Sequence, residues 1–352
     1  MKVRHTAIFE NLRREILAGK FDSERKLPSE CALARRFSVS RPTISRVMLD
    51  LKREGLVVTR PGAATVLSRF ALNATGALGL IDPGNGQGNV LSTICRHIVR
   101  FAEQAGWDVI REVVEATDPV ARAREIEGLA ARFSSEHVSG VFIQPLEYLT
   151  DNASASNDVV THLDLAKIPV VLLDYDIVSP PARSRYDLVA IDNLAAGLAV
   201  GHRLLASGSG KLAFLMPCGS PATVEDRCRG VACSVIKHGG VWTEKGNLLR
   251  ATPENARAVS RFVRVNGPDA IVCGNDALAV RLRETLERLG LAGSIRLAGF
   301  DGLSDVAWDG YVTVRQPCED MAAVAFHTLV SRIKNPRLPA RTIVLPATVI
   351  ER

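Results

Sequence analysis

Apolar residues near the start of the chain recur every three or four positions, and this spacing predicts helices. The apolar stripe of the first helix consists of Ile8, Phe9, Leu12, Ile16 and Leu17. A second helix is expected after Ser29, whose hydroxyl can accept a hydrogen bond from a free N–H of the first turn. Ser40 has the same position before a third helix, and Pro42 lies in the first turn of that helix, where no backbone donor is needed.

The third helix separates an apolar stripe from a polar face. The stripe consists of Ile44, Val47, Met48 and Leu51, and the polar residues near the start of the helix are Arg41, Thr43, Ser45 and Arg46. Side chains of these polar types bond to base edges and phosphates. Two short runs rich in β-branched residues, 56–59 and 64–67, predict an antiparallel hairpin after the helix. This order of parts is typical of a winged helix-turn-helix, which places one helix in the major groove of DNA.

The same segment carries a series of motifs in a fixed order. They are Leu27 to Glu30, Leu33-Ala34, Phe37, Val39 to Arg41, Thr43-Ile44, Arg46, Leu51 and Glu54 to Val57. With these motifs, the N-terminal part resembles the GntR family of bacterial regulators over about 65 residues. The resemblance implies DNA contacts by Arg35, Arg41, Thr43 and Arg46, an approach of Gly62 to the minor groove, and further candidates in Arg36, Ser40 and Ser45. The hairpin lacks the second glycine and the aromatic residue that are frequent in the family, and a solvent-exposed charge is the alternative for each arginine.

Basic residues are concentrated in this part of the chain. Residues 1–70 contain 15 Lys and Arg against 7 Asp and Glu, whereas the whole chain has a net charge of +6. The other residues therefore carry a net charge of −2, and all of the excess positive charge lies in the first fifth of the chain. Such a concentration favours binding to nucleic acid.

Beyond residue 76 the pattern changes to short apolar runs that alternate with helical stretches. The runs are 77–81, 138–143, 169–173, 212–216, 270–273 and 295–300. Runs of this kind are typical of parallel strands that are buried on both faces, so they predict a doubly wound α/β fold. Ligands bind at the carboxyl ends of such strands, and polar residues such as Asp82 and Asp174 stand at those ends here.

Several motifs of this larger part resemble the LacI/GalR regulators. They are Asp192 to Gly197, Arg227 to Gly230, Pro268 to Ala279, Ile295 to Asp301 and Val312 to Pro317. The resemblance implies a type I periplasmic-binding-protein-like fold with a ligand cleft, in which lobe one is formed by about 76–207 and 317–335 and lobe two by about 208–315 and the last strand. We therefore expect an α+β winged helix-turn-helix domain (1–69), a linker (70–76) and a two-lobed α/β domain for effector binding and dimerisation (77–352). This combination, with the long segment 144–167, resembles the arabinose-repressor subfamily.

The resemblance also implies an effector site. Arg227, Asn275 and Asp301 match positions that hold the effector in LacI/GalR regulators, and their donors and acceptors suit the hydroxyls of a polyol. Further candidates are Asp82, Asn85, Glu147, Asp192 and Trp308. Alternatively, Asn275 and Asp301 only cap helices, and Trp308 is a core residue. The chain has 3 Trp, 4 Tyr and 11 Phe, and this small supply of stacking rings favours a sugar over a purine.

Together these patterns predict a bacterial transcription repressor of carbohydrate-use genes. We expect a homodimer that binds a palindromic operator in double-stranded DNA and releases it on binding a sugar; a regulator that senses a purine or another small metabolite is the alternative. An enzyme is not expected, because GxSxG, GxxxxGK(S/T) and HExxH motifs are missing from the sequence. We expect neither a cofactor nor a metal site, and we interpret His97, His162, His202, His238 and His327 as isolated.

The sequence further predicts a cytoplasmic location. It has no apolar run long enough to span a membrane, and its N-terminus mixes acidic and basic residues, unlike a signal peptide. The seven cysteines form no CxxC pair, which favours reduced thiols. Besides a repressor and an enzyme, an exported solute-binding protein is a third possible class, and the basic N-terminal part argues against it.

Overall fold

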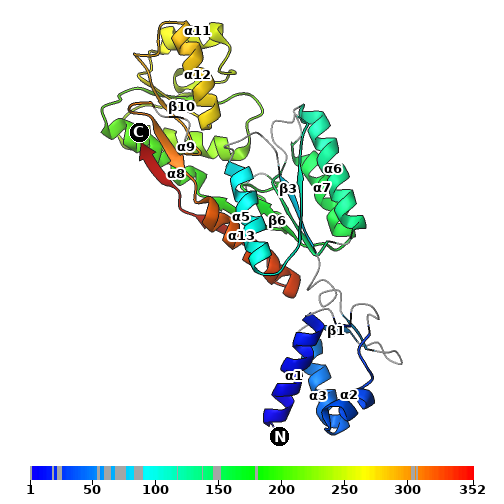
Figure 1. The fold of residues 1–352 in the computed structure, drawn as a ribbon. Helices are drawn as coiled ribbons and strands as arrows, with labels where there is room; N and C mark the ends of the chain where they lie inside the picture. Colours follow the sequence, from blue (N-terminus) through cyan, green and yellow to red (C-terminus); the bar gives the residue numbers. More distant parts are fainter. Residues whose placement is uncertain are drawn as a thin grey trace.

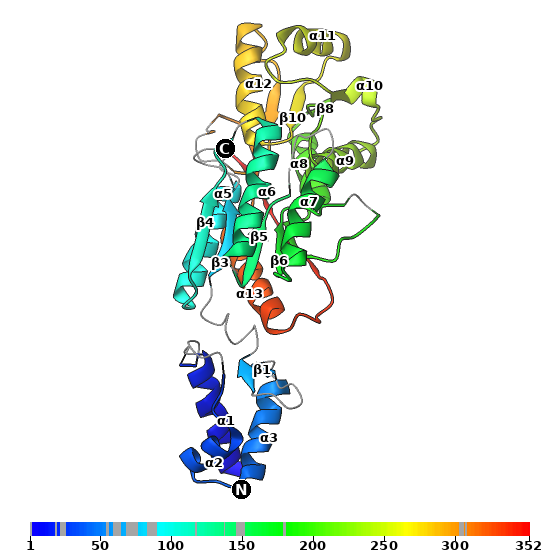
Figure 2. The ribbon, with the colours of Figure 1, turned by 90° about the vertical axis from the view of Figure 1, so that its right-hand side faces the viewer.

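The structure is a computed structural model (Figures 1 and 2). It describes residues 2–17, 20–21, 26–53, 56–58, 65–67, 77–82, 90–116, 118–136, 138–145, 152–178, 181–302, 306 and 308–352. Three predicted site residues, Gly62, Asn85 and Glu147, lie outside the described residues. None of the described helices is long and apolar enough to cross a membrane.

Within its described residues, the N-terminal domain, here called the head, contains three helices and a short hairpin, as predicted. Its elements are α1 (Lys2–Leu17), α2 (Glu30–Phe37), α3 (Arg41–Arg53), β1 (Val57–Val58) and β2 (Val66–Leu67). The two strands are antiparallel, with Val57 opposite Leu67. Ser29 caps α2 by accepting a hydrogen bond of 3.2 Å from the backbone N–H of Ala32, which confirms the predicted start of this helix.

A single apolar cluster holds the head together. The predicted stripe of α3 is buried, with Ile44, Val47 and Leu51 fully enclosed, and it packs against Leu12 of α1 and Leu33 of α2. Because three helices contribute to one small core, the polar side of α3 is presented to solvent in a fixed orientation.

The remainder of the chain, here called the body, contains two six-stranded sheets. Lobe one is built from β3 (Leu78–Asp82), α5 (Val90–Gln104), β4 (Val109–Val113), α6 (Pro119–Ser135), β5 (Gly140–Ile143), α7 (Asn152–Leu165), β6 (Val170–Leu173), β7 (Asp187–Ile191), α13 (Cys318–Lys334) and β13 (Thr342–Leu345). Its sheet has the order β13-β7-β6-β5-β3-β4, and all neighbouring strands are parallel. Helices α5 and α13 cover one face and α6 and α7 the other (Figure 1).

Lobe two repeats this layered arrangement. It is built from α8 (Asn193–Ala206), β8 (Leu212–Leu215), α9 (Ala222–Lys237), α10 (Glu244–Asn247), β9 (Leu248–Leu249), α11 (Ala256–Asn266), β10 (Ala270–Cys273), α12 (Asp276–Arg288), β11 (Arg296–Ala298), β12 (Val312–Arg315) and β14 (Thr348–Glu351). The sheet order is β14-β12-β11-β10-β8-β9, and only the β12–β14 pair is antiparallel. The chain therefore passes between the lobes three times, after β7, after β12 and after β13.

The first of these crossings lies earlier than the sequence predicts. We expected lobe one to extend to residue 207, but α8 packs in lobe two, where Val200 and Leu204 are fully buried beside α9. The reason is a close helix–helix contact made through glycines. A Cβ atom at Gly197 would collide with the carbonyl oxygen of Arg227, and one at Gly230 would collide with backbone atoms of α8.

Candidate DNA interface and effector site

The polar side chains at the start of α3 are accessible, as a DNA-reading surface requires. Arg41, Ser45 and Arg46 are exposed, Thr43 is half-buried, and the side chain of Arg41 is 69% exposed. Arg46, and Arg35 on the neighbouring α2, have no partner within the described part of the chain. Their guanidinium groups are therefore available to bases or phosphates.

Glu30 organises this surface, although the sequence analysis assigned it no role beyond its motif. Its carboxylate accepts a hydrogen bond of 2.7 Å from the hydroxyl of Ser45 and lies 3.6 Å from Nε of Arg41. At the entry to α3, the hydroxyls of Ser40 and Thr43 are 2.9 Å apart. These contacts orient side chains at the start of the helix before any DNA is present.

Arg36 differs from Arg35 because it is engaged inside the head. Its guanidinium donates to the carboxylate of Glu15, which also pairs with Lys20 at 2.6 Å, and it lies 4.9 Å from the centre of the Phe37 ring. The hydrogen bond from Arg36 lowers the pKa of Glu15 despite partial burial. Arg36 therefore joins α2 to α1, and a contact with DNA would have to compete with this ion pair.

In the body, Arg227 is buried at the junction of the two lobes. Its Nε donates to Oδ1 of Asn193 at 2.8 Å, and its Nη1 donates to the carbonyl oxygen of Gly274 at 2.8 Å. The guanidinium carbon lies 4.7 Å from the centre of the Phe300 ring. The remaining nitrogen, Nη2, has no partner among the described residues, so it can donate to a ligand.

Two acidic side chains approach this arginine from different lobes. Asp174 follows β6 of lobe one and Asp301 follows β11 of lobe two, and both have a positive φ, 75° and 116°. Burial raises the pKa of Asp174, and it raises the pKa of Asp301 to about 7, while Arg227 counteracts burial at both. Nε2 of Gln316, on the second crossing, donates to Asp301 at 3.1 Å. Non-glycine residues with positive φ are concentrated at functional sites, because the strain must be held by the surrounding structure.

A cavity of about 340 Å³ lies beside this cluster, between the lobes. It is lined from lobe one by Asp174 and Val344, from the first crossing by Asp192 and Asn193, and from α9 by Thr223 and Asp226 among others. Its size is in the lower part of the range of small-molecule sites. Arg227 and Asp301 do not line the cavity themselves; Asp174 and Asn193, which do, connect it to Arg227. This junction is a candidate site for a small ligand that offers several hydrogen-bonding groups.

Two known families match the chain. The family described as bacterial regulatory proteins, gntR family, matches residues 4–67, and the periplasmic binding protein-like domain matches residues 202–352. The chain therefore joins a head that matches the gntR family to a body that matches the periplasmic binding protein-like domain. This combination confirms both resemblances on which the sequence analysis relied.

Relatives and solved structures agree with this two-part organisation. An arabinose metabolism transcriptional repressor of Geobacillus stearothermophilus is 26% identical over 95% of this chain and 93% of its own length. A structure described as a transcriptional regulator CelR–cellobiose complex covers 92% of this chain and 98% of its own, with a TM-score of 0.63 at 19% identity. A LacI family regulator from Enterococcus faecium, with bound ribose, covers 78% of this chain and 97% of its own, with a TM-score of 0.61 at 20% identity.

The other predicted effector residues of the periplasmic-binding-protein-like body are engaged in local contacts. Asn275 caps α12, with Oδ1 2.8 Å from the backbone N of Leu278, and Asp192 caps α8 in the same way through Ala195 at 2.8 Å. Asp192 also lines the cavity, whereas Asn275 follows β10 next to Gly274, whose carbonyl oxygen binds Arg227. A helix cap does not exclude contact with a ligand, because one oxygen of each side chain can accept more than one hydrogen bond.

Two further aspartates, one in each lobe of the body, are tied to other side chains. Asp276 is buried and accepts hydrogen bonds from Tyr311 at 2.6 Å and from Thr313 at 2.7 Å, so it braces β12. Asp82, at the end of β3, accepts from Ser92 at 2.8 Å and from Nε of Arg111 at 3.0 Å. A ligand that reaches Asp82 would therefore meet a carboxylate that is already paired.

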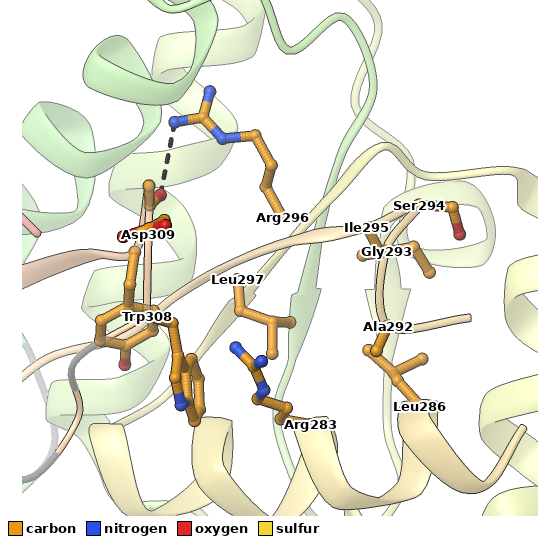
Figure 3. A pocket seen from close by; sticks show the side chains of 12 residues that line it. Arg283, Leu286, Ala292, Gly293, Ser294, Ile295, Arg296, Leu297, Trp308 and Asp309 are labelled. Carbon is orange, nitrogen blue, oxygen red and sulfur yellow. Dashed lines mark hydrogen bonds between the residues drawn. The ribbon is translucent and has the colours of Figure 1, made fainter. Parts of the chain in front are cut away.

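Trp308 is not brought together with Arg227. It lies over Arg283, whose guanidinium is 4.4 Å from the indole ring, and edge-on to Tyr311 at 5.0 Å. It lines a separate cavity of about 560 Å³ together with Arg296 and Asp309 (Figure 3). This second cavity lies at the amino end of β11, whereas Asp301 follows the carboxyl end, so we leave Trp308 out of the proposed effector site. We include Asp174, which was not among the predicted effector residues.

Proposed function

We propose that the protein is a bacterial transcription repressor that binds a palindromic operator as a homodimer and releases it when a sugar binds between the lobes of the body. The head comprises residues 1–69, the linker 70–76 and the sensing body 77–352 in this proposal. A repressor acts on the chromosome, so we also infer a cytoplasmic location. The observation that carries the proposal is that one chain combines two features. The helix-turn-helix presents accessible arginines, and the body contains a buried cluster around Arg227 beside a cavity.

In the head, we assign DNA contacts to Arg35, Arg41, Thr43, Ser45 and Arg46, with Ser40 at the entry to the helix and Gly62 in the wing. The accessibility of Arg41 and Arg46 supports direct contact. Dimers of such heads read two half-sites about 34–36 Å apart, which is one turn of the duplex. Every arginine that neutralises a phosphate should make binding weaker at higher salt.

In the body, we assign effector contacts to Arg227, Asp174, Asp301, Asp192 and Asn275. Hydroxyl groups of a sugar both donate and accept, so one ring can satisfy the free Nη2 of Arg227 and the oxygens of the two aspartates. Neighbours solved with cellobiose and ribose, and a relative named for arabinose metabolism, support a neutral sugar. The lobes must differ in arrangement between the free and the sugar-bound protein, because only a ligand that prefers one arrangement can shift the equilibrium.

The proposal is tested by fluorescence anisotropy with a labelled duplex from the promoter region of the gene itself. We expect binding that exceeds binding to a shuffled duplex at least about 1,000-fold, a ratio typical of specific regulators. Addition of arabinose, ribose, xylose, cellobiose or related sugars should lower the affinity, and purine bases are included as the alternative class. Equal affinity for the promoter and the shuffled duplex would exclude the repressor, whereas specific binding that no sugar changes would exclude only sugar sensing.

A further inference from the structure

Two histidine rings from different helices lie side by side on lobe two. His202 lies near the end of α8, and His238 follows the last residue of α9. Nδ1 of His202 and Nε2 of His238 are 3.3 Å apart, and the ring centroids are 5.1 Å apart. The two residues are 36 positions apart in the sequence, and our interpretation of both as isolated was wrong.

The spacing of the two nitrogens suits a shared metal ion as well as a hydrogen bond. Without a metal, an N–H group of one ring can donate to the other ring at 3.3 Å. Two imidazole nitrogens that each lie about 2.0–2.1 Å from a tetrahedral ion are about 3.3–3.4 Å apart, with ring centroids about 5.2 Å apart. The observed 3.3 Å and 5.1 Å match both values.

The protonation pattern of His238 also suits a ligand. Nδ1 of His238 lies 2.8 Å from the carbonyl oxygen of Ser234, and a carbonyl oxygen can only accept. The proton of the neutral ring is therefore on Nδ1, which leaves a lone pair on Nε2, the atom that faces His202. Histidines that bind metals are typically oriented by such a hydrogen bond from the other ring nitrogen.

The helices that carry the two rings are held in a fixed relation. Next to His202, a Cβ atom at Gly201 would collide with the side chain of Ser234, so α8 and α9 are in direct contact one turn from the pair. Both rings are exposed, so an ion can reach them without a structural change. His202 lies on α8 and His238 directly follows α9, so the packing of the two helices fixes the spacing of the rings better than long loops would.

We propose that His202 and His238 form a binding site for a divalent transition-metal ion. Imidazole ligands suit Zn²⁺, Cu²⁺ and Ni²⁺. No group of three or more His, Cys, Asp and Glu that could hold a metal occurs among the described residues, so water fills the other positions of the ion. The site lies at the ends of α8 and α9 that point away from the cavity, because Asn193 and Thr223, near the other ends, line that cavity.

The test uses the full chain without a histidine tag, freed of metal by chelation. Isothermal titration with Zn²⁺ and Cu²⁺ should give one strong site per chain, and the Cu²⁺ spectrum by electron paramagnetic resonance should show coupling to two nitrogens. His202→Gln and His238→Gln should each weaken binding at least tenfold. His327→Gln changes an exposed histidine on α13 and is the matched control, with unchanged affinity.

Either of two results overturns the proposal. One is a His202→Gln/His238→Gln double variant that binds Zn²⁺ and Cu²⁺ as tightly as the wild type. The other is a wild-type spectrum in which Cu²⁺ couples to fewer than two nitrogens. Circular dichroism of each variant checks that the fold is retained, and the spectrum of the wild type gives a result that does not depend on any variant.

Discussion

Nε of Arg227 donates a hydrogen bond of 2.8 Å to Oδ1 of Asn193, and this bond joins the middle of α9 to the first residue of α8. Both side chains are buried. Asn193 directly follows the segment in which the chain passes from lobe one to lobe two. A ligand that binds Arg227 would therefore contact the residue that anchors this crossing, which would couple the proposed effector site to the arrangement of the lobes.

The first prediction concerns the geometry of Arg227. Arg227→Lys keeps the charge but removes the planar fork that donates to Asn193 and Gly274 at the same time. We expect the sugar concentration needed for operator release to rise at least about tenfold, equivalent to about 1.4 kcal/mol of binding free energy. Operator affinity without sugar should stay within about twofold, which anisotropy measures on the same samples.

Arg229→Lys is the control for this variant. Arg229 lies on the same helix, is 59% exposed and pairs only with Glu225 and Asp226 among the described residues. The same rise in sugar requirement for both variants would show that a general change in charge geometry on α9, and not the buried fork, is responsible.

The second prediction concerns Arg46 of the recognition helix. Arg46→Ala should lower operator affinity by about 1–3 kcal/mol if the side chain reads a base, and it should then tolerate changes at one position of each half-site. If Arg46 binds a phosphate instead, affinity should fall equally for all sequences, and the dependence on salt should become less steep by about one ion. Arg264→Ala removes an exposed arginine from the body and should change neither quantity.

The third prediction follows from the raised pKa of Asp301. Because its pKa rises from 3.8 to about 7, the folded protein keeps a proton that the unfolded chain has lost in this pH range. The free energy of unfolding should therefore fall as the pH rises from about 4 to about 7. Asp301→Asn removes this contribution, so the variant should gain stability relative to the wild type between pH 5 and pH 8. Urea unfolding at pH 5 and at pH 8 measures the difference in the free energy of unfolding between the variant and the wild type. The same difference at both pH values would contradict the raised pKa.

The fourth prediction concerns the contact between α8 and α9. Gly197→Ala places a methyl group against the backbone of Arg227, so we expect a loss of about 2 kcal/mol or more in the free energy of unfolding. Gly128→Ala is the matched control, because Gly128 also lies within a helix, α6, and has open space around its Cβ position. This control should be neutral or stabilising by up to about 1 kcal/mol, the difference in helix propensity. Equal losses in thermal unfolding would mean that the helices can separate to admit the methyl group.

Local features of the fold could be predicted from the sequence because they depend on neighbouring residues. The cap at Ser29 and the buried stripe of α3 follow from hydrogen-bonding capacity and helical spacing, and the structure confirms both. The short apolar runs at 212–216 and 270–273 became β8 and β10, because short runs of this kind are typical of strands buried between helical layers. The limits of these two strands shifted by one residue at most.

Features that depend on contacts between distant segments could not be predicted in the same way. The membership of α8 in lobe two rests on glycine contacts with a helix more than 30 positions away. The sequence marked Asp174 only as one of several acidic residues after strands, and its proximity to Arg227 appears only when the lobes meet. The pair His202 and His238 has no motif spacing, since it depends on how α8 and α9 pack.

The late position of α13 and β13 has a consequence for synthesis of the protein. Met321, Ala325 and Leu329 of α13 are fully enclosed in lobe one, and β13 forms an edge of its sheet. A nascent chain can therefore complete the head early, while the face of lobe one that α5 and α13 cover lacks α13 until residues 318–334 have been synthesised. A premature stop codon before residue 318 would leave a complete head joined to an incomplete lobe one, so such alleles are expected to misregulate the target genes and not only to lose the protein.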